Sequence, residues 1–127
     1  MSPDQTSSKA TADTARDPHC LFCKIVAGEV PAEVVKTSAH AIAFRDLHPQ
    51  APTHVLVIPR EHTANAAETA AVGGVDALVG LAAEVAEEEG LDHGYRLVFN
   101  TGPDSGQAVF HTHLHLLGGR SLSWPPG

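Results

Sequence analysis

The stretch His111-Thr112-His113-Leu114-His115-Leu116-Leu117 alternates imidazoles with residues suited to a core. Successive side chains of a β-strand point to opposite faces of a sheet, so the three histidines are expected to share one face. Thr112, Leu114 and Leu116 would then point the other way, toward the core. The alternation predicts a strand over Val109–Leu117 that presents a row of imidazoles.

Adjacent imidazoles suit either phosphorus chemistry or metal binding. A neutral ring nitrogen is nucleophilic near pH 7, and neighbouring rings can donate hydrogen bonds or protons. If a backbone carbonyl holds one nitrogen of the middle residue, His113, the other nitrogen is free for attack. His111 and His115 could then stabilise the transition state and protonate the leaving group. The alternation alone favours catalysis and metal binding equally.

The chain has the composition of one small globular domain. Its 127 residues are 43% apolar, which is enough for a core without disulfide bonds. The formal net charge of -7 argues against nonspecific binding to nucleic acid or to anionic membranes. A small anionic ligand in a pocket of local donors remains compatible with that charge.

The N-terminal residues differ in composition from the rest. Residues 1–17 are rich in Ser, Thr, Ala and Asp, which predicts a disordered tail before a folded domain over residues 18–127. The sequence has no apolar run of membrane-spanning length and no secretory signal. These features favour a cytoplasmic protein with no membrane partner.

Hydrophobic spacing predicts the order helix, hairpin, strand, helix and two strands. The expected elements are a short N-terminal helix within Cys20–Gly28, a hairpin of Val34–Lys36 and Ala41–Arg45, a central strand at Val55–Ile58, one long amphipathic helix over Val75–Glu89, and strands at Tyr95–Asn100 and Val109–Leu117. This order favours an α+β fold with an antiparallel sheet over alternating parallel units.

The chain resembles the histidine-triad (HIT) superfamily. Residues 111–117 match its signature His-φ-His-φ-His-φ-φ, where φ is an apolar residue and Thr112 departs at the first φ. The similarity also includes Phe22, Lys24-Ile25, Ile42–Asp46, Pro49–His54, Val57–Pro59, Asn100, Gly106-Gln107 and Gly118–Arg120. The ending Trp124-Pro125-Pro126-Gly127 resembles the Hint branch of that superfamily.

This resemblance implies a HIT-like, dimer-forming domain that hydrolyses the P–N bond of purine nucleoside 5′-phosphoramidates. The ligand would be a purine nucleotide such as AMP or GMP, with no organic cofactor, and His113 would carry a covalent nucleotidyl intermediate. His115 would contact the phosphate oxygens, and His111 would orient the array with His54 as its partner. The homodimer would form, by analogy, through the helix Val75–Glu89 and the strand Tyr95–Asn100.

The resemblance also implies a set of nucleotide-binding residues. Asp46 would bind the ribose hydroxyls, because its carboxylate oxygens accept hydrogen bonds. The remaining contacts would be Leu21, Phe22, Ile25, Phe44 and Leu47 around the base, Asn100, Gly106 and Gln107 at the phosphate or leaving group, and Trp124 on the leaving-group side.

One position departs from the Hint branch in a way that bears on rate. Ala108 stands where that branch commonly has a serine after the Gly-Gln pair, so proton delivery to the leaving group must rely on histidine, water or Gln107. Two alternatives remain open. The first is a dinucleoside polyphosphate hydrolase of the same superfamily, against which the ending Trp124–Gly127 argues. The second is a nucleotide- or zinc-binding regulatory module with weak catalysis, which Ala108 favours.

Cys20-x-x-Cys23 predicts a structural zinc site. A redox role would require a thioredoxin-like βαβ context, which the sequence lacks. His54 and His111, on adjacent expected strands, would complete a closed Cys₂His₂ set, and many bacterial HIT proteins resemble this arrangement. The alternative is a pair of buried thiols without a metal.

Overall fold

The computed structural model describes residues 17–127, so most of the expected tail lies outside the described residues. The elements are α2 (Leu21–Val26), β1 (Val34–Thr37), β2 (Ala41–Arg45), β3 (Thr53–Pro59), α3 (Ala66–Ala71), α4 (Val75–Glu88), β4 (Tyr95–Phe99), a 3₁₀ turn (Pro103–Ser105) and β5 (Leu114–Gly118). Asp17, the last residue of the expected tail, belongs to the fold, because its carbonyl accepts a hydrogen bond from the Cys20 amide.

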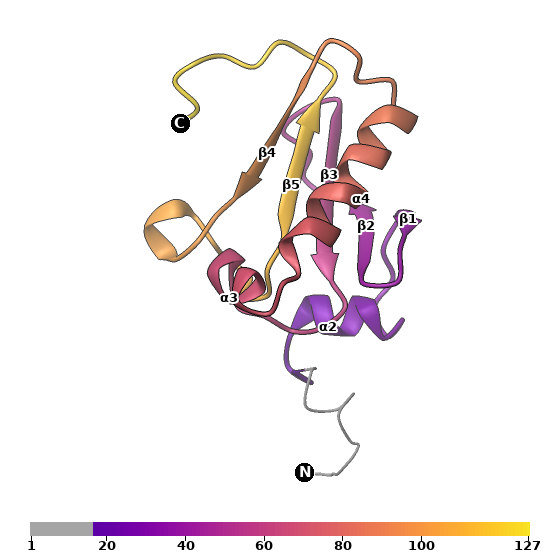
Figure 1. Cartoon of the computed structure of the whole chain (residues 1–127), viewed down its shortest axis with the longest axis vertical. Coiled ribbons are helices and arrows are strands. Elements are labelled where there is room, and N and C mark those ends of the chain that lie inside the picture. The colour runs from indigo at the N-terminus through magenta and orange to yellow at the C-terminus, as the bar shows by residue number, and fades with distance from the viewer. Residues whose placement is uncertain (1–16) are drawn as a thin grey trace.

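The strands form one antiparallel sheet in the order β1-β2-β3-β5-β4 (Figure 1). The expected α+β fold and the central place of β3 are therefore confirmed. All seven residues of β3 are buried, which explains why its apolar run shows no alternation. Pro59 ends this strand, since proline lacks the amide hydrogen that would continue a ladder.

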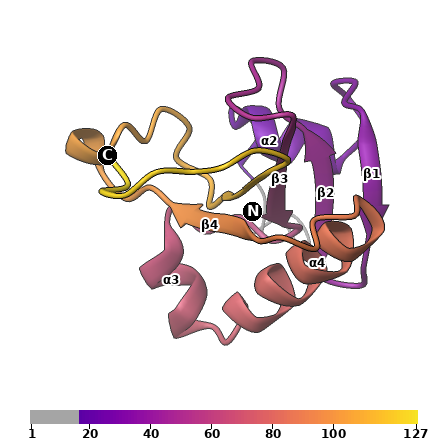
Figure 2. The same ribbon diagram turned by 90° about the horizontal axis from the view of Figure 1, so that it is seen from above.

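The two faces of the sheet bury different apolar clusters. Helix α4 lies on one face and α2 on the other (Figure 2). The α4 face includes Val55 and Val57 of β3 with Leu114 and Leu116 of β5. The opposite face is lined by Phe22, Ile42, Phe44, Leu56 and Ile58, with partly buried Ile25 and Val109 against them. His54 and His115 alternate with residues of the α4 face, so their side chains belong to the α2 face.

Helix α4 confirms the long amphipathic helix expected from the sequence. Its buried residues recur at helical spacing: Leu78, Leu81, Ala82, Val85 and Ala86. Gly90 follows the helix with a φ of 72°, a left-handed conformation that glycine adopts without a Cβ clash. Among residues 17–127, no helix combines the length and the apolar character needed to cross a membrane.

Two elements differ from the expectation. Strand β5 begins at Leu114, so the predicted start at Val109 is wrong, and His111 and His113 precede the strand. The Thr112 amide hydrogen-bonds the Thr63 carbonyl at 2.7 Å, outside the sheet, which ends the ladder at this point.

Helix α3 was not expected, because its sequence has no apolar stripe and only Thr69 is buried. A local capping signal was nevertheless present. The Asn65 side chain accepts from the Glu68 amide at 3.0 Å, and Glu68 accepts from the Ala64 amide at 2.8 Å. Such reciprocal bonds satisfy amides that have no partner within a first helical turn.

Candidate functional site

His113 presents one ring nitrogen away from the backbone. Its Nδ1 lies 2.9 Å from the carbonyl oxygen of His111. A carbonyl can only accept, so Nδ1 carries the hydrogen and Nε2 keeps the lone pair. The edge-to-face ring of Phe22, 5.1 Å away between centroids, packs against the imidazole. This arrangement leaves an oriented Nε2 directed away from the backbone, as the predicted nucleophilic role of His113 requires.

A chain of hydrogen bonds fixes the proton positions on two further histidines. The Gln50 amide donates to His54 Nδ1 at 3.0 Å, which leaves the His54 hydrogen on Nε2. That nitrogen lies 2.9 Å from His115 Nδ1, so His54 donates and His115 accepts. The remaining hydrogen of His115 is then on Nε2, which is buried and has no partner among the described residues. A buried donor without a partner costs free energy, and a ligand oxygen would satisfy it.

Burial keeps these histidines neutral. It lowers the pKa of His115 to about 4, and repulsion from His113 and His54 acts in the same direction against the attraction of Asp46. Burial also lowers the pKa of His54, again opposed by Asp46. Neutral rings are required for the hydrogen-bond chain above, because a protonated imidazole has no acceptor.

A second cluster brings together four side chains that can bind a metal ion. The Sγ atoms of Cys20 and Cys23 and the Nδ1 atoms of His62 and His111 belong to a group whose ligand atoms all lie within 4.8 Å of one another. The fourth member is His62, not His54, so the expected ligand set is corrected at that position. His54 instead faces His115, with the Asp46 carboxylate 3.4 Å from its Nε2. Its expected pairing with His111 is wrong for the same reason.

The distances in this cluster fit a tetrahedral ion. Ligands at typical Zn–N and Zn–S bond lengths are about 3.3 to 3.8 Å apart. The observed separations are 3.2 Å between His62 and His111, 3.3 Å between Cys23 and His62, and 3.4 and 3.5 Å from His111 to Cys20 and Cys23. His111 Nε2 donates to the Pro59 carbonyl at 2.9 Å, so its Nδ1 lone pair faces the cluster.

Burial makes an uncompensated thiolate unfavourable at Cys23. Burial raises the pKa of Cys23 to about 11, and the neighbouring Cys20 adds to this, against a hydrogen bond from the Asp17 amide. A divalent cation reverses this effect, because a coordinated thiol is deprotonated. Burial also lowers the pKa of His111 to about 4, which keeps its ring available as a neutral ligand.

The expected base pocket is assembled in part. Phe22, Ile25 and Phe44 meet in the apolar cluster on the α2 face. Leu21 and Leu47 lie outside that cluster and are 47% and 88% exposed. Their contact with a base therefore stays a prediction.

Gln107 has a different environment from the one expected. Its Nε2 donates to the carbonyls of Ala64 and Val109 at 2.7 and 3.1 Å, and its Oε1 accepts from the Gly102 amide at 2.8 Å. Both amide hydrogens are used, so a contact to phosphate would require breaking one of these bonds. In the structure Gln107 holds the loop before the histidines, and its expected catalytic role stays a prediction.

The other predicted contacts lie around the row. Asp46 accepts from the His48 amide through Oδ1, and its side chain is 19% exposed. Asn100 is partly buried after β4, and Gly106 has a φ of 91° in the loop. Trp124 is 82% exposed, in a tail held by a bond from Arg96 to the Ser123 carbonyl. Their roles toward a nucleotide stay predictions.

Comparison with known proteins matches residues 27–122 to the HIT domain. A protein of Synechococcus elongatus described as an uncharacterised HIT-like protein is 50% identical, over 84% of this chain and 96% of its own length. The 14 kDa zinc-binding protein of Zea mays is 44% identical, over 87% of this chain and 90% of its own length. Adenylylsulfatase HINT1 of Arabidopsis thaliana is 41% identical, over 93% of this chain and 83% of its own length.

Solved structures share the same fold. A HIT family hydrolase from Legionella pneumophila has a TM-score of 0.80 and 48% identity, over 86% of this chain and 100% of that chain. A Zn-bound histidine triad family protein from Mycobacterium smegmatis has a TM-score of 0.70 and 34% identity, over 84% of this chain and 81% of that chain.

The lowered pKa of His115 predicts a pH-dependent stability. The unfolded chain binds a proton on this residue near pH 6.5, whereas the folded chain resists protonation until about pH 4. Neutral His115 therefore makes its whole contribution to the free energy of unfolding above pH 6.5. This contribution is lost as the pH falls from 6.5 toward 4. We expect the free energy of unfolding of His115→Gln, measured in urea titrations at pH 7, 6, 5 and 4.5, to decrease less steeply with falling pH than that of the parent.

The exposed His40 provides the control for this comparison, and His40→Gln is expected to follow the parent. Equal slopes for His115→Gln and the parent would contradict the account of a buried neutral ring.

Proposed function

The chain belongs to the HIT family, and from this premise we propose that it hydrolyses the P–N bond of purine nucleoside 5′-phosphoramidates through a nucleotidyl intermediate on His113. The observation that carries the proposal is the bond from His113 Nδ1 to the His111 carbonyl, which leaves Nε2 as a free nucleophile. A regulatory module would not need a nucleophile oriented in this way.

The first step transfers the nucleotidyl group to the enzyme. Nε2 of His113 attacks phosphorus, a new P–N bond forms, and the bond to the amine breaks with its electron pair on the departing nitrogen. The unpartnered Nε2–H of His115, whose ring centroid lies 5.0 Å from that of His113, supplies a hydrogen bond to a phosphate oxygen. Ala108 has no hydroxyl and Gln107 is occupied, so the amine takes its proton from a histidine or from water.

The second step restores the free imidazole. A water oxygen bonds to phosphorus, the bond to His113 Nε2 breaks, and the nucleoside monophosphate leaves. The departing imidazole can accept the water proton, because a ring nitrogen with a lone pair is a base near pH 7. One water is consumed and one amine and one monophosphate are released per cycle.

A second substrate class has a specific observation in its favour. The Arabidopsis relative is named an adenylylsulfatase and is 41% identical over most of both chains. Sulfate would then replace the amine as the leaving group, with the same attack at phosphorus. Sulfate is a weaker base than an amine and leaves without prior protonation, so the absence of a hydroxyl at Ala108 matters less for it.

Turnover of three substrates separates these hypotheses. We expect the parent to hydrolyse an aminoalkyl adenosine phosphoramidate faster than adenylyl sulfate or a diadenosine polyphosphate. His113→Ala should lose activity by a factor of roughly 10⁴ or more, the scale found when a nucleophile is removed. The exposed-site variant His40→Ala should keep it.

A different order of rates would change the assignment. Faster turnover of adenylyl sulfate or of the polyphosphate would reassign the substrate class, and an inactive parent with intact nucleotide binding would favour the regulatory module.

We also infer a structural zinc ion held by Cys20, Cys23, His62 and His111. The convergence of two thiols and two imidazole lone pairs supports it, and the Zea mays relative is named a zinc-binding protein. The ion would have a structural role, because four protein ligands would leave no coordination position open to substrate. The ion would anchor His111, whose carbonyl holds His113.

Metal content distinguishes the two ligand sets. We expect about one zinc per chain in protein purified without chelator, as in closed structural sites. His62→Asn should lose most of this zinc on dialysis against a mild chelator, whereas His54→Asn should keep it. If His62→Asn kept its zinc and His54→Asn lost it, the ligand set expected from the sequence, with His54, would be correct. A parent protein without stoichiometric zinc would contradict the proposal.

We further propose a homodimer through α4 and β4. Strand β4 is an edge of the sheet, and Tyr95 and Val79 are 42% and 38% exposed. Edge strands and exposed apolar side chains favour association with a partner. A monomeric mass in sedimentation velocity would contradict this interface.

A further inference from the structure

Three buried threonine hydroxyls meet directly behind the histidine row. We call Thr63, Thr69 and Thr112 the threonine cluster. Their Oγ1 atoms are separated by 2.7 Å (Thr63 to Thr69), 2.8 Å (Thr63 to Thr112) and 2.9 Å (Thr69 to Thr112). The residues come from the loop after β3, from α3 and from the segment between His111 and His113, so the cluster joins three separate parts of the chain.

Every hydroxyl hydrogen of the cluster has an acceptor. Thr112 can donate to the Thr63 carbonyl at 3.0 Å, and Thr69 can donate to the Asn65 carbonyl at 3.1 Å. Thr63 can then donate to either of the other two oxygens. A buried network without an orphaned donor holds its members rigidly, because each lost bond would leave an unsatisfied group.

The cluster is attached to His113 through a single peptide unit. The amide of Thr112 and the carbonyl of His111 are the two ends of one planar peptide. The amide end donates to the Thr63 carbonyl at 2.7 Å, and the carbonyl end accepts from His113 Nδ1 at 2.9 Å. Fixing the amide end therefore fixes the direction of the carbonyl that orients the imidazole.

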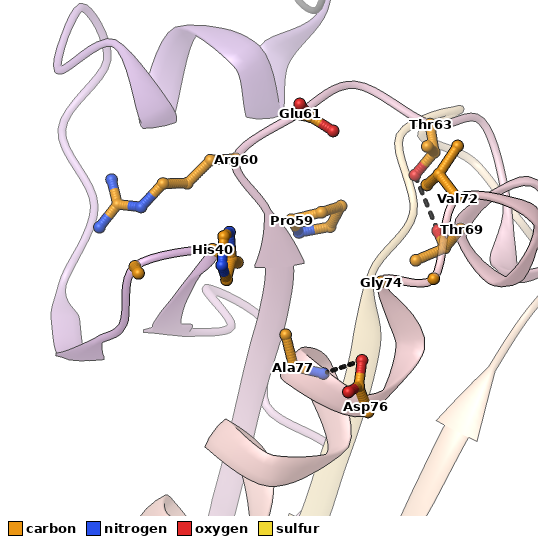
Figure 3. A pocket seen from close by; sticks show the side chains of 12 residues that line it. His40, Pro59, Arg60, Glu61, Thr63, Thr69, Val72, Gly74, Asp76 and Ala77 are labelled. Carbon is orange, nitrogen blue, oxygen red and sulfur yellow. Dashed lines mark hydrogen bonds between the residues drawn. The ribbon is translucent and has the colours of Figure 1, made fainter.

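The Thr63 carbonyl is the backbone acceptor that holds this peptide at its amide end. The segment precedes β5 and lies outside the sheet ladder. A cavity of about 540 Å³ lies beside Thr63 and Thr69, between residues 72–77 on one side and His40 with residues 59–61 on the other (Figure 3). The hydroxyl bonds join Thr63, whose carbonyl receives the Thr112 amide, to Thr69 of α3 and to Thr112, so they restrain the position of that carbonyl.

We propose that the threonine cluster is a positioning device for the nucleophile, which sets the ring orientation and the tautomer of His113 through the His111–Thr112 peptide. The inference rests on the proposed function only for its kinetic consequence. Without the hydroxyls, the backbone bond from Thr112 to Thr63 is left to restrain the amide end of the peptide, whose rotation lets the His113 hydrogen redistribute between Nδ1 and Nε2. A ring whose Nε2 carries the hydrogen has no lone pair directed at phosphorus.

Matched variants separate the hydroxyl from its methyl group. Thr112→Val removes the hydroxyl and keeps the shape, whereas Thr112→Ser keeps the hydroxyl and loses the methyl. The triple variant Thr63→Val, Thr69→Val, Thr112→Val removes all three hydroxyls together, so no hydroxyl is left unpaired and the fold is retained even if a single variant is unstable. Thr37→Val, on exposed β1, is the control.

Two readouts test the inference, namely steady-state kinetics on the phosphoramidate and long-range ¹H–¹⁵N NMR of the His113 ring without substrate. In the parent we expect the Nδ1–H tautomer. In Thr112→Val and the triple variant we expect both tautomers, with kcat reduced by about tenfold to a hundredfold and KM little changed, as misplacement of a reacting group predicts. Thr112→Ser should restore both readouts, and Thr37→Val should not alter them.

The outcomes are separable from those of the proposed function. Unchanged tautomer and kcat in the folded valine variants would overturn the inference, as would a serine variant as impaired as the valine one. A shifted tautomer in valine variants of a protein that does not cleave phosphoramidates would support the positioning role and contradict the proposed substrate instead.

Discussion

The hydrogen bond between His113 Nδ1 and the His111 carbonyl determines which nitrogen of His113 faces outward, and the surrounding structure maintains that bond. His111 takes part in it through its backbone, while its side chain belongs to the Cys–His cluster. His111 thus links the Cys–His cluster to the orientation of the proposed nucleophile. Loss of the cluster would act on catalysis through His111 without any contact with substrate.

His111 and His113 direct opposite ring nitrogens toward their surroundings, because a backbone carbonyl accepts a hydrogen bond from the remaining ring nitrogen of each. Pro59 accepts from His111 Nε2, which turns Nδ1 toward the thiols. The His111 carbonyl in turn accepts from His113 Nδ1, which leaves His113 Nε2 for the proposed attack. Burial then keeps His111 and His115 neutral, with pKa values lowered to about 4. Identical side chains in one short segment therefore face their surroundings with different ring nitrogens, set by their hydrogen-bond partners.

The periodic parts of the fold could be predicted from the sequence. Helix α4 and strand β3 have patterns that depend only on which face is buried, and the Leu114 and Leu116 alternation identified β5. The start of β5 could not be predicted, because Thr112 hydrogen-bonds the Thr63 carbonyl instead of a strand partner. Helix α3 was not predicted, because it has no apolar stripe and is held by its N-terminal cap and by buried Thr69.

Within the site, the sequence identified the residue types and missed their partners. His62 was absent from the expected ligand set, yet it belongs to the cluster with the two thiols, whereas His54 pairs with His115. Both histidines belong to the segment of β3 and the loop after it, so only the path of the chain past Pro59 decides which ring reaches the cysteines. Nothing in the sequence indicated that the Gln107 carboxamide holds the preceding loop.

The central claim is that phosphorus becomes bonded to His113 during turnover. Mass spectrometry of protein quenched in denaturant during hydrolysis of an adenosine phosphoramidate tests it most directly. The account predicts a nucleotidyl group on His113 that disappears as substrate is exhausted. Turnover without an adduct, or an adduct on His115, would contradict it.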